Sequence, residues 1–145
     1  MLIREAVQGD LSGLLELYTH LHDNPMPELD SGLRRLWNGI LSDQNHHILV
    51  GELMEKLVCS CVVIIVPNLT RGQRPYALIE NVITHPNHRK NGYASKVLAA
   101  ASKLAEDAGC YKIMLLTGAK EEITLHFYEQ AGFNSRDKTA FIKWL

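Results

Sequence analysis

The residues best suited to chemistry lie between positions 77 and 133 of this 145-residue chain. An apolar segment, residues 78–84, leads into a basic turn that contains Arg89, Lys90 and Gly92, and a helical pattern of apolar residues follows directly. The first N–H groups of a helix have no partner within the helix, and the helix dipole makes this end positive. The sequence therefore predicts a phosphate-binding site at this turn.

Glu80 stands on the apolar segment before the turn. It alternates with Leu78 and Val82, so in a regular strand the three side chains share one face. A carboxylate among apolar neighbours is unfavourable unless it has a partner or a chemical task. Glu80 is therefore a candidate functional residue.

The elements that must position these residues follow from hydrophobic periodicity. Strands are predicted over residues 1–6, 47–53, 57–66, 75–84, 112–117 and 139–145. Helices are predicted from an N-cap at Asp10 to about residue 21, after Asp30 or Ser31, over 91–108 and over 121–131. This order, without an internal repeat or linker, predicts one α+β domain, residues 1–145, with a mixed sheet and helices on both faces.

Composition narrows the class of protein. With 46% hydrophobic and 21% charged residues, the chain has the make-up of an ordinary globular protein. Its formal net charge of −1 gives no general attraction to nucleic acid or to an anionic membrane. No apolar run approaches the roughly 20 residues that cross a bilayer, and no signal peptide is recognisable, so we expect a cytoplasmic protein. Cys59, Cys61 and Cys110 are expected to be reduced thiols that pack as small hydrophobic side chains.

The basic turn is part of a longer pattern. Arg89-x-x-Gly92-x-Ala94 follows an apolar strand and the pair His85-Pro86, and the segment Phe127-Tyr128-x-x-x-Gly132-Phe133 comes later in the chain. These segments, in this order, resemble the GNAT acetyltransferases, and the resemblance covers nearly the whole chain in layout. It implies the GNAT fold, a mostly antiparallel, splayed sheet flanked by helices, and acetyl-CoA as co-substrate.

The resemblance assigns the cofactor to the turn and to the strand before it. In the family, the turn binds the pyrophosphate of coenzyme A mostly through backbone N–H groups. Here the turn corresponds to Arg89, Lys90, Asn91, Gly92, Tyr93, Ala94 and Ser95. The family's strand splays from its neighbour and binds pantetheine through main-chain groups, which here belong to Val82, Ile83 and Thr84. By position, the N–H of Val82 points at the thioester oxygen, as in an oxyanion hole.

Tyr128 aligns with the family tyrosine beside the cofactor sulfur, where it can protonate the departing thiolate. The alternative is a half-buried aromatic side chain that packs a helix against the sheet, as Phe127 and Phe133 are expected to do.

A narrower similarity concerns the acceptor. The segment Ile79-Glu80-Asn81-Val82, with residues 110–113 downstream, is similar to glucosamine-6-phosphate N-acetyltransferases, whose matching glutamate lines the substrate region. Three interpretations of Glu80 remain open: a base for an ammonium substrate, an anchor for that cation, or a carboxylate that forms an ion pair or faces water. The chain reads Leu116-Thr117-Gly118 where those enzymes carry an acidic residue, so the sugar substrate does not follow.

These observations predict an N-acetyltransferase that moves an acetyl group from acetyl-CoA to a primary amine of a small molecule by direct attack in a ternary complex. Two alternatives are an acetyltransferase of protein or peptide amines and a CoA-binding sensor module with little turnover. No set of Cys, His and Asp residues has the spacing of a zinc site, so no metal is expected.

Two further regions have possible roles, one after the first predicted helix and one at the C-terminus. His20, His22 and the loop 24–28 either border the acceptor pocket, as the first two helices of the family do, or carry exposed histidines without a role. Many family members pair through their final strands, and the apolar residues 140–145 therefore suggest a homodimer.

Overall fold

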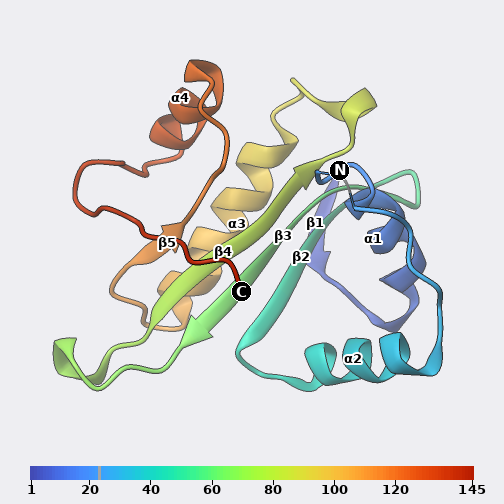
Figure 1. Ribbon diagram of the computed structural model, residues 1–145, viewed down its shortest axis with the longest axis horizontal. Helices are drawn as coiled ribbons and strands as arrows, with labels where there is room; N and C mark the ends of the chain where they lie inside the picture. The colour runs from blue at the N-terminus through green and yellow to red at the C-terminus, as the bar shows by residue number, and fades with distance from the viewer. Residues whose placement is uncertain (23) are drawn as a thin grey trace.

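A five-stranded sheet forms the centre of the fold (Figure 1). The computed structural model describes residues 1–22 and 24–145, and its strands are β1 (Leu2–Glu5), β2 (His46–Leu53), β3 (Lys56–Val66), β4 (Tyr76–Thr84) and β5 (Ile113–Leu115). The strands lie side by side in chain order, and every neighbouring pair is antiparallel except β4 and β5, which are parallel. The predicted α+β class with a mostly antiparallel sheet is confirmed.

Helices cover both faces of this sheet (Figure 1). α1 (Leu11–Tyr18) and α2 (Ser31–Ser42) pack on one face, which we call the α1/α2 face, around Leu14, Trp37 and Val50. α3 (Tyr93–Asp107) and α4 (Glu122–Gln130) pack on the opposite face, the α3 face. Short 3₁₀ turns, η1 (Gln8–Asp10), η2 (Arg71–Gln73) and η3 (Pro86–His88), connect some of these elements.

The two predicted helix caps have different outcomes. The Asp30 carboxylate accepts a hydrogen bond from the N–H of Leu33 at 2.8 Å, which confirms it as the N-cap of α2. Asp10 is the N-cap residue of α1 by position, as predicted, but its side chain forms no hydrogen bond with an N–H group of that helix. Instead it accepts from the N–H of Val7 at 2.7 Å and pairs with the guanidinium of Arg4 at 2.6 Å. The hydrogen bonds from Arg4 hold the pKa of the Asp10 carboxyl below its usual value.

Cys59 and Cys61 lie in the core of the α3 face. Both side chains are fully buried and both thiols are free. Burial raises the pKa of Cys59 to about 11 and that of Cys61 to about 12. The two thiols therefore pack as small hydrophobic groups, as predicted, and carry almost no thiolate at neutral pH.

Gly51 on β2 lies against the same core. A Cβ atom there would collide with Sγ of Cys59 and come within 3.0 Å of Sδ of Met1. We therefore expect Gly51→Ala to lower the free energy of unfolding by roughly 1–3 kcal/mol, which urea denaturation measures. The double variant Gly51→Ala/Cys59→Ala should regain most of this loss, because it removes the colliding sulfur; equal losses in the single and double variants would contradict the explanation.

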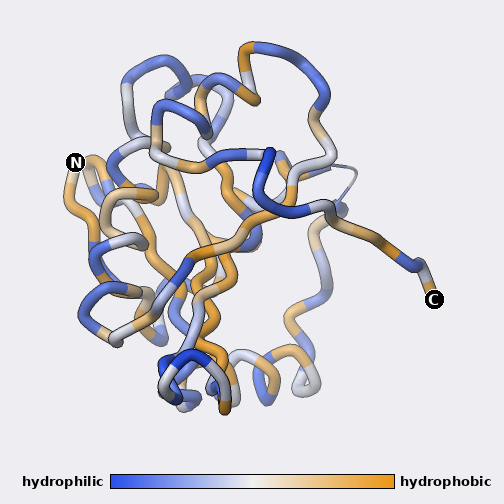
Figure 2. Tube along the Cα trace, turned by 90° about the vertical axis from the view of Figure 1, so that its left-hand side faces the viewer, coloured by the Kyte–Doolittle hydropathy of each residue, from blue (hydrophilic) through white to orange (hydrophobic). Residues whose placement is uncertain are grey.

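The last predicted strand is wrong. Residues 139–145 form no strand, and the predicted strand 112–117 is reduced to the three residues of β5. Four apolar side chains of the final segment are exposed, namely Phe141, Ile142, Trp144 and Leu145. Figure 2 shows the C-terminal segment projecting away from the rest of the chain. A strand needs a partner edge to satisfy its backbone groups, and β5 offers a short one, so hydrophobic sequence alone does not make this segment a strand.

Among the described residues, no helix is both long and apolar enough to span a membrane.

Candidate active site

The turn between β4 and α3 has a backbone suited to binding an anion. Lys90 and Gly92 both adopt left-handed conformations, with φ of 61° and 73°. Gly92 is the residue before α3, and no side chain that the structure describes caps the N–H groups of the first helical turn, at Tyr93, Ala94 and Ser95. These N–H groups are therefore free to bind a ligand at the positive end of a 15-residue helix.

The side chains of the turn are arranged around its backbone. Asn91 donates hydrogen bonds from Nδ2 to the carbonyl oxygens of His88 at 3.2 Å and Arg89 at 3.0 Å. Nε of Arg89 donates to the carbonyl of Thr84 at 3.3 Å, which ties the turn to the end of β4. Arg89 and Lys90 are exposed, so their charges face solvent beside the unpaired N–H groups. The structure thus brings the predicted residues of the turn together at one place.

β4 is irregular just before the turn. Ser60 on β3 pairs with Ile83 and Val62 pairs with Glu80, so two residues of β4, Asn81 and Val82, lie opposite one residue of β3. This is a β-bulge, and Asn81 adopts the left-handed conformation with φ of 52°.

The bulge corrects one prediction about side-chain directions. Glu80 pairs with Val62, which packs on the α1/α2 face. Val82 packs instead with Ile79 in the core of the α3 face. The extra residue reverses the alternation of the strand, so Glu80 and Val82 lie on opposite faces and not on the same one.

A gap opens in the sheet beside the bulge. β5 pairs with β4 at Ala77, Leu78 and Ile79 and at no later residue. Within the described chain, the edge of β4 that faces β5 therefore has no strand partner from Glu80 to Thr84. An extended ligand can bind such an edge as an additional strand would. Val82, Ile83 and Thr84 all lie on this unpaired stretch and lead directly to the turn.

Tyr128 lies on α4 and packs on the α3 face. Its ring makes edge-to-face contacts with Phe127 and Phe133, with centroids 5.0 and 6.3 Å away. It belongs to the same core as Val82, next to the gap in the sheet. Burial raises the pKa of the Tyr128 phenol above its ordinary value, and so, to a lesser extent, does the neighbouring Cys61. The phenol therefore keeps its proton at neutral and mildly alkaline pH.

Glu80 lies on the other side of the sheet from Tyr128. Its side chain is exposed and forms no ion pair with any residue that the structure describes. The side chain therefore faces water, which is one half of the third interpretation, whereas the other half, an ion pair with a protein cation, finds no support among the described residues. A solvent-facing carboxylate can still accept a proton or bind a cationic group.

A cavity that sequence reasoning did not locate lies on the α1/α2 face beside the bulge. It has a volume of about 490 Å³ and is lined by Tyr18, Leu21, His22, Asn24 and Asn81. Of the residues expected to border an acceptor pocket, His22 and Asn24 line this cavity, whereas His20 does not. The cavity was not predictable because it depends on how the end of α1 packs against the bulge.

His20 makes a different contact. Its ring packs edge to face on His85, with centroids 4.6 Å apart, and His85 in turn lies 5.5 Å from His88. Nδ1 of His85 accepts a hydrogen bond from the N–H of Asn87 at 3.2 Å. Partial burial and the two neighbouring imidazoles lower the pKa of His85. These contacts attach the segment after α1 to the turn between β4 and α3. Among the described residues, no three His, Cys, Asp or Glu side chains are grouped so that they could hold a metal ion.

Comparison with known proteins defines the class of this chain. The sequence model of the Acetyltransferase (GNAT) family matches residues 13–133. The chain therefore belongs to the GNAT family of acetyltransferases.

Individual relatives agree with this assignment. A glucosamine 6-phosphate N-acetyltransferase of Trypanosoma brucei brucei is 30% identical over 142 residues, which cover 94% of this chain and 90% of that protein. A solved structure from Agrobacterium tumefaciens str. C58 is 39% identical, with a TM-score of 0.90 and coverage of 99% and 100% of the two chains. The aminoglycoside N-acetyltransferase AAC(6')-Iy, solved in complex with CoA, shares the fold at 17% identity, with a TM-score of 0.76 and coverage of 99% and 98%.

Proposed function

We propose that this protein transfers an acetyl group from acetyl-CoA to a primary amine of a small molecule, in the cytoplasm. The observation that carries the proposal is the continuity between the unpaired edge of β4 and the uncapped start of α3. The edge suits the amide groups of pantetheine, and the turn suits the pyrophosphate that follows. The structure of a GNAT-fold relative in complex with CoA supports the same assignment.

The residues of the turn and strand would have distinct roles. N–H groups of Gly92, Tyr93, Ala94 and Ser95 would bind the pyrophosphate, with positive charge from Arg89 and Lys90. Main-chain groups of Val82, Ile83 and Thr84 would hold the pantetheine chain. The N–H of Val82, at the bulge, would donate to the acetyl carbonyl oxygen and stabilise the negative charge that forms there.

The two sides of the sheet would serve the two substrates. Glu80 and the cavity lie on the α1/α2 face, whereas Tyr128 lies on the α3 face. A thioester held at the gap between β4 and β5 would thus be open to an amine from one side and have its sulfur toward Tyr128 on the other. The amine nitrogen would form a bond to the carbonyl carbon, and the carbon–sulfur bond would break. Tyr128 would protonate the leaving sulfur, and Glu80, directly or through water, would take the proton of the amine.

An acyl-enzyme on cysteine is not part of this proposal. A nucleophilic cysteine must be a thiolate, and burial raises the pKa values of both Cys59 and Cys61. The amine therefore attacks the thioester directly while both substrates are bound.

We further propose that the protein is a homodimer in which the final segment packs against a second copy. Phe141 and Trp144 are 92% and 87% exposed. Exposed apolar side chains that are grouped in this way are typical of a surface that binds a partner. β5 is an edge strand whose outer side is free in the described chain. Both features are satisfied if the segment of one copy covers the open edge of the other.

Deletion of residues 139–145 tests this dimer. We expect the full chain to sediment as a dimer and the truncated chain as a monomer, because the deletion removes the exposed apolar side chains. Lys143→Ala is the control: it keeps those side chains and should leave the dimer intact. A full chain that is monomeric at all concentrations would contradict the proposal.

The reaction itself is tested by the release of the CoA thiol from acetyl-CoA. The panel of amines would contain glucosamine, glucosamine 6-phosphate, amino acids, polyamines, aminoglycosides and a lysine peptide, with heat-denatured protein as the blank. Release that depends on a small amine supports the proposal. Release with the lysine peptide alone would assign the protein to peptide acetylation instead, and acetyl-CoA binding without release would identify a sensor module.

A further inference from the structure

The cavity beside the bulge has three features that are uncommon where side chains serve only to pack the protein. The hydroxyl of Tyr18 is buried and forms no close hydrogen bond, although the buried hydroxyl of Ser60 lies beside it. His22 and Asn81 are both left-handed, with φ of 56° and 52°. Buried unpaired polar groups and strained backbones are unfavourable, and they gather at sites where a ligand uses them.

The described walls of this cavity combine apolar and polar groups and contain no permanent positive charge. Asn24 and Asn81 contribute amides and His22 an imidazole, and none of the five lining residues is Lys or Arg. Asn24 is held by a hydrogen bond from its Nδ2 to the carbonyl of Tyr18 at 3.3 Å. Glu80, next to Asn81 in the chain, adds an exposed carboxylate on the same face of the sheet.

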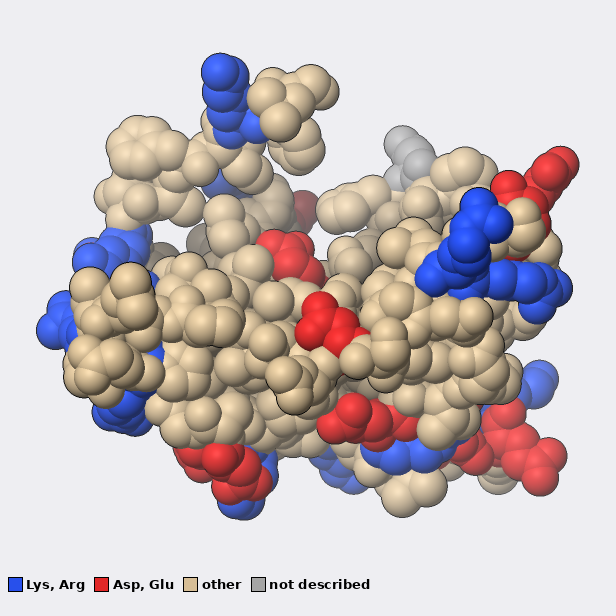
Figure 3. Space-filling view, turned by 90° about the horizontal axis from the view of Figure 1, so that it is seen from below, with Lys and Arg blue, Asp and Glu red and all other residues tan. Residues whose placement is uncertain are grey.

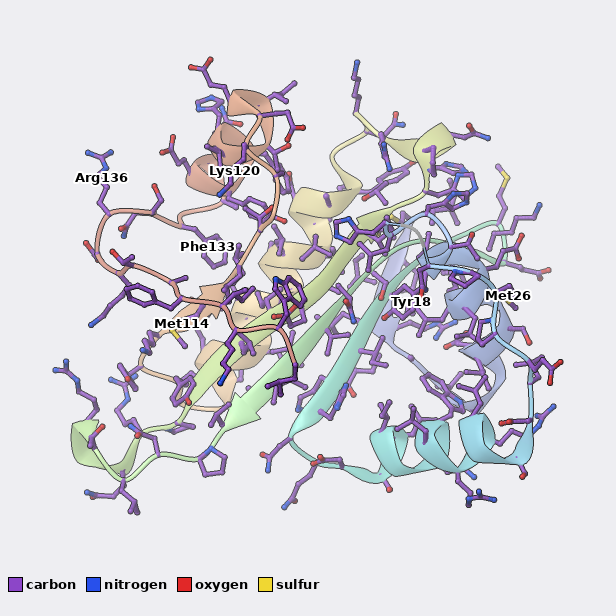
Figure 4. All side chains as sticks on the ribbon, in the orientation of Figure 1. Tyr18, Met26, Met114, Lys120, Phe133 and Arg136 are labelled. Carbon is purple, nitrogen blue, oxygen red and sulfur yellow. The ribbon has the colours of Figure 1, made fainter. Side chains whose placement is uncertain are left out.

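The ring of Tyr18 adds an aromatic wall. Tyr18 projects from the end of α1 toward the sheet (Figure 4), where its hydroxyl lies beside that of Ser60, which is fully buried. Burial raises the pKa of Tyr18 to about 12, although the Ser60 hydroxyl acts in the opposite direction. The phenol is thus neutral at physiological pH. An aromatic face suits a cationic amine or the C–H face of a sugar ring.

The face of the molecule seen from below carries charges of both signs. Some acidic side chains lie near its middle and others toward its edges, whereas most Lys and Arg side chains lie toward the edges (Figure 3). A phosphate group of the acceptor would be placed near Glu80 without a guanidinium or ammonium group from the described cavity wall. Phosphate recognition in proteins relies on such groups or on a backbone nest, so this cavity disfavours a phosphorylated acceptor.

We propose that the acceptor is a polar amine that carries no phosphate or other anionic group, and that the cavity formed by Tyr18, Leu21, His22, Asn24 and Asn81 binds it. The proposal rests on the acetyltransferase function proposed above. It separates this chain from the Trypanosoma brucei brucei relative, whose name gives glucosamine 6-phosphate as the substrate.

Matched pairs of amines test the proposal. The value of kcat/KM for CoA release would be measured at pH 8 with glucosamine against glucosamine 6-phosphate, ethanolamine against O-phosphoethanolamine, and serine against O-phosphoserine. For each pair that reacts, we expect the member without phosphate to be favoured by roughly tenfold or more, the effect of about 1.4 kcal/mol of electrostatic repulsion. A preference for the phosphorylated members would overturn the proposal.

A variant makes the test independent of the intrinsic reactivity of the amines. Asn24→Lys places an ammonium group in the wall and should shift the ratio of the two kcat/KM values toward the phosphorylated member by roughly tenfold. Ser12→Lys adds the same charge to an exposed position of α1 outside the cavity and should leave the ratio unchanged. Equal ratios in the two variants would show that the acceptor does not bind in this cavity.

The outcomes distinguish the two proposals. If phosphorylated amines are acetylated preferentially, the acetyltransferase function stands and the acceptor class proposed here is wrong. If no amine of these pairs or of the wider panel supports CoA release, the proposed function fails and this inference fails with it.

Discussion

Replacing Tyr128 by phenylalanine is expected to lower kcat for amine acetylation by roughly 100-fold, the contribution of a well-placed general acid. The variant keeps the ring that contacts Phe127 and Phe133 and removes the hydroxyl alone. The thiolate of CoA would then leave without a proton donor. Affinity for acetyl-CoA and the melting temperature should change little, because the packing of α4 on the α3 face is kept.

The pH dependence of kcat provides a second readout of Tyr128. Burial raises the pKa of the Tyr128 phenol above its ordinary value, so this phenol keeps its proton to a higher pH than an exposed tyrosine does. Activity that depends on the protonated phenol should therefore persist through about pH 9 and decline at higher pH. This decline should be absent in Tyr128→Phe, whose residual rate has no phenol to titrate.

Tyr111→Phe is the matched control for this experiment. Tyr111 lies near Tyr76, with ring centroids 6.4 Å apart, and is not part of the α3-face core. Loss of its hydroxyl should leave kcat and the pH profile unchanged. Tyr128 would be an ordinary packing residue if Tyr128→Phe and Tyr111→Phe both retained the full rate from about pH 6 to 10.

The parts of the site that the sequence predicted depend on local geometry. A left-handed glycine directly before a helix, with basic residues beside it, restricts the backbone of the turn whatever the rest of the fold does. The turn at Arg89–Ser95 was therefore predictable, and so were the apolar stripes that place α3 and α4 on the sheet.

The parts that the sequence did not predict depend on contacts between distant segments. The bulge at Asn81 is a difference in register between β3 and β4, and nothing in the alternation of β4 itself reveals it. Its consequence is large, because it places Val82 and Glu80 on opposite faces of the sheet. The contact of His20 with His85 likewise joins α1 to the turn after β4. The final segment shows the same limit: its apolar pattern suits a strand, but a strand forms only where an edge is available.

In the proposed reaction, the bulge and the gap would let the site hold two substrates at once. An unbroken strand would present both substrates with a closed sheet. The reversal at Asn81 and the short β5 open the sheet at the residue where the acetyl carbonyl is proposed to lie. Cofactor and amine would then approach from different sides without competing for space.

Gly92→Glu should lower the affinity for acetyl-CoA by about 100-fold or more. The residue lies immediately before the uncapped N–H groups of α3, and a carboxylate there would repel the pyrophosphate by about 3 kcal/mol at close range. Isothermal titration with acetyl-CoA measures the change. Ala in place of Gly92 should have a smaller effect, because no atom lies within 4 Å of the added Cβ and only the left-handed backbone, with φ of 73°, is unfavourable.

Gly109 provides the control for the backbone effect. It lies just after the other end of α3, is left-handed with φ of 75°, and also has no atom within 4 Å of the Cβ that a substitution would add. Gly92→Glu and Gly109→Glu should therefore lose similar stability, roughly 1–2 kcal/mol each. Only the variant at Gly92 should lose affinity for acetyl-CoA, because only that end of the helix has free N–H groups that can bind a phosphate. Equal affinities in the two variants would place the cofactor elsewhere and leave the unpaired edge of β4 without the ligand proposed for it.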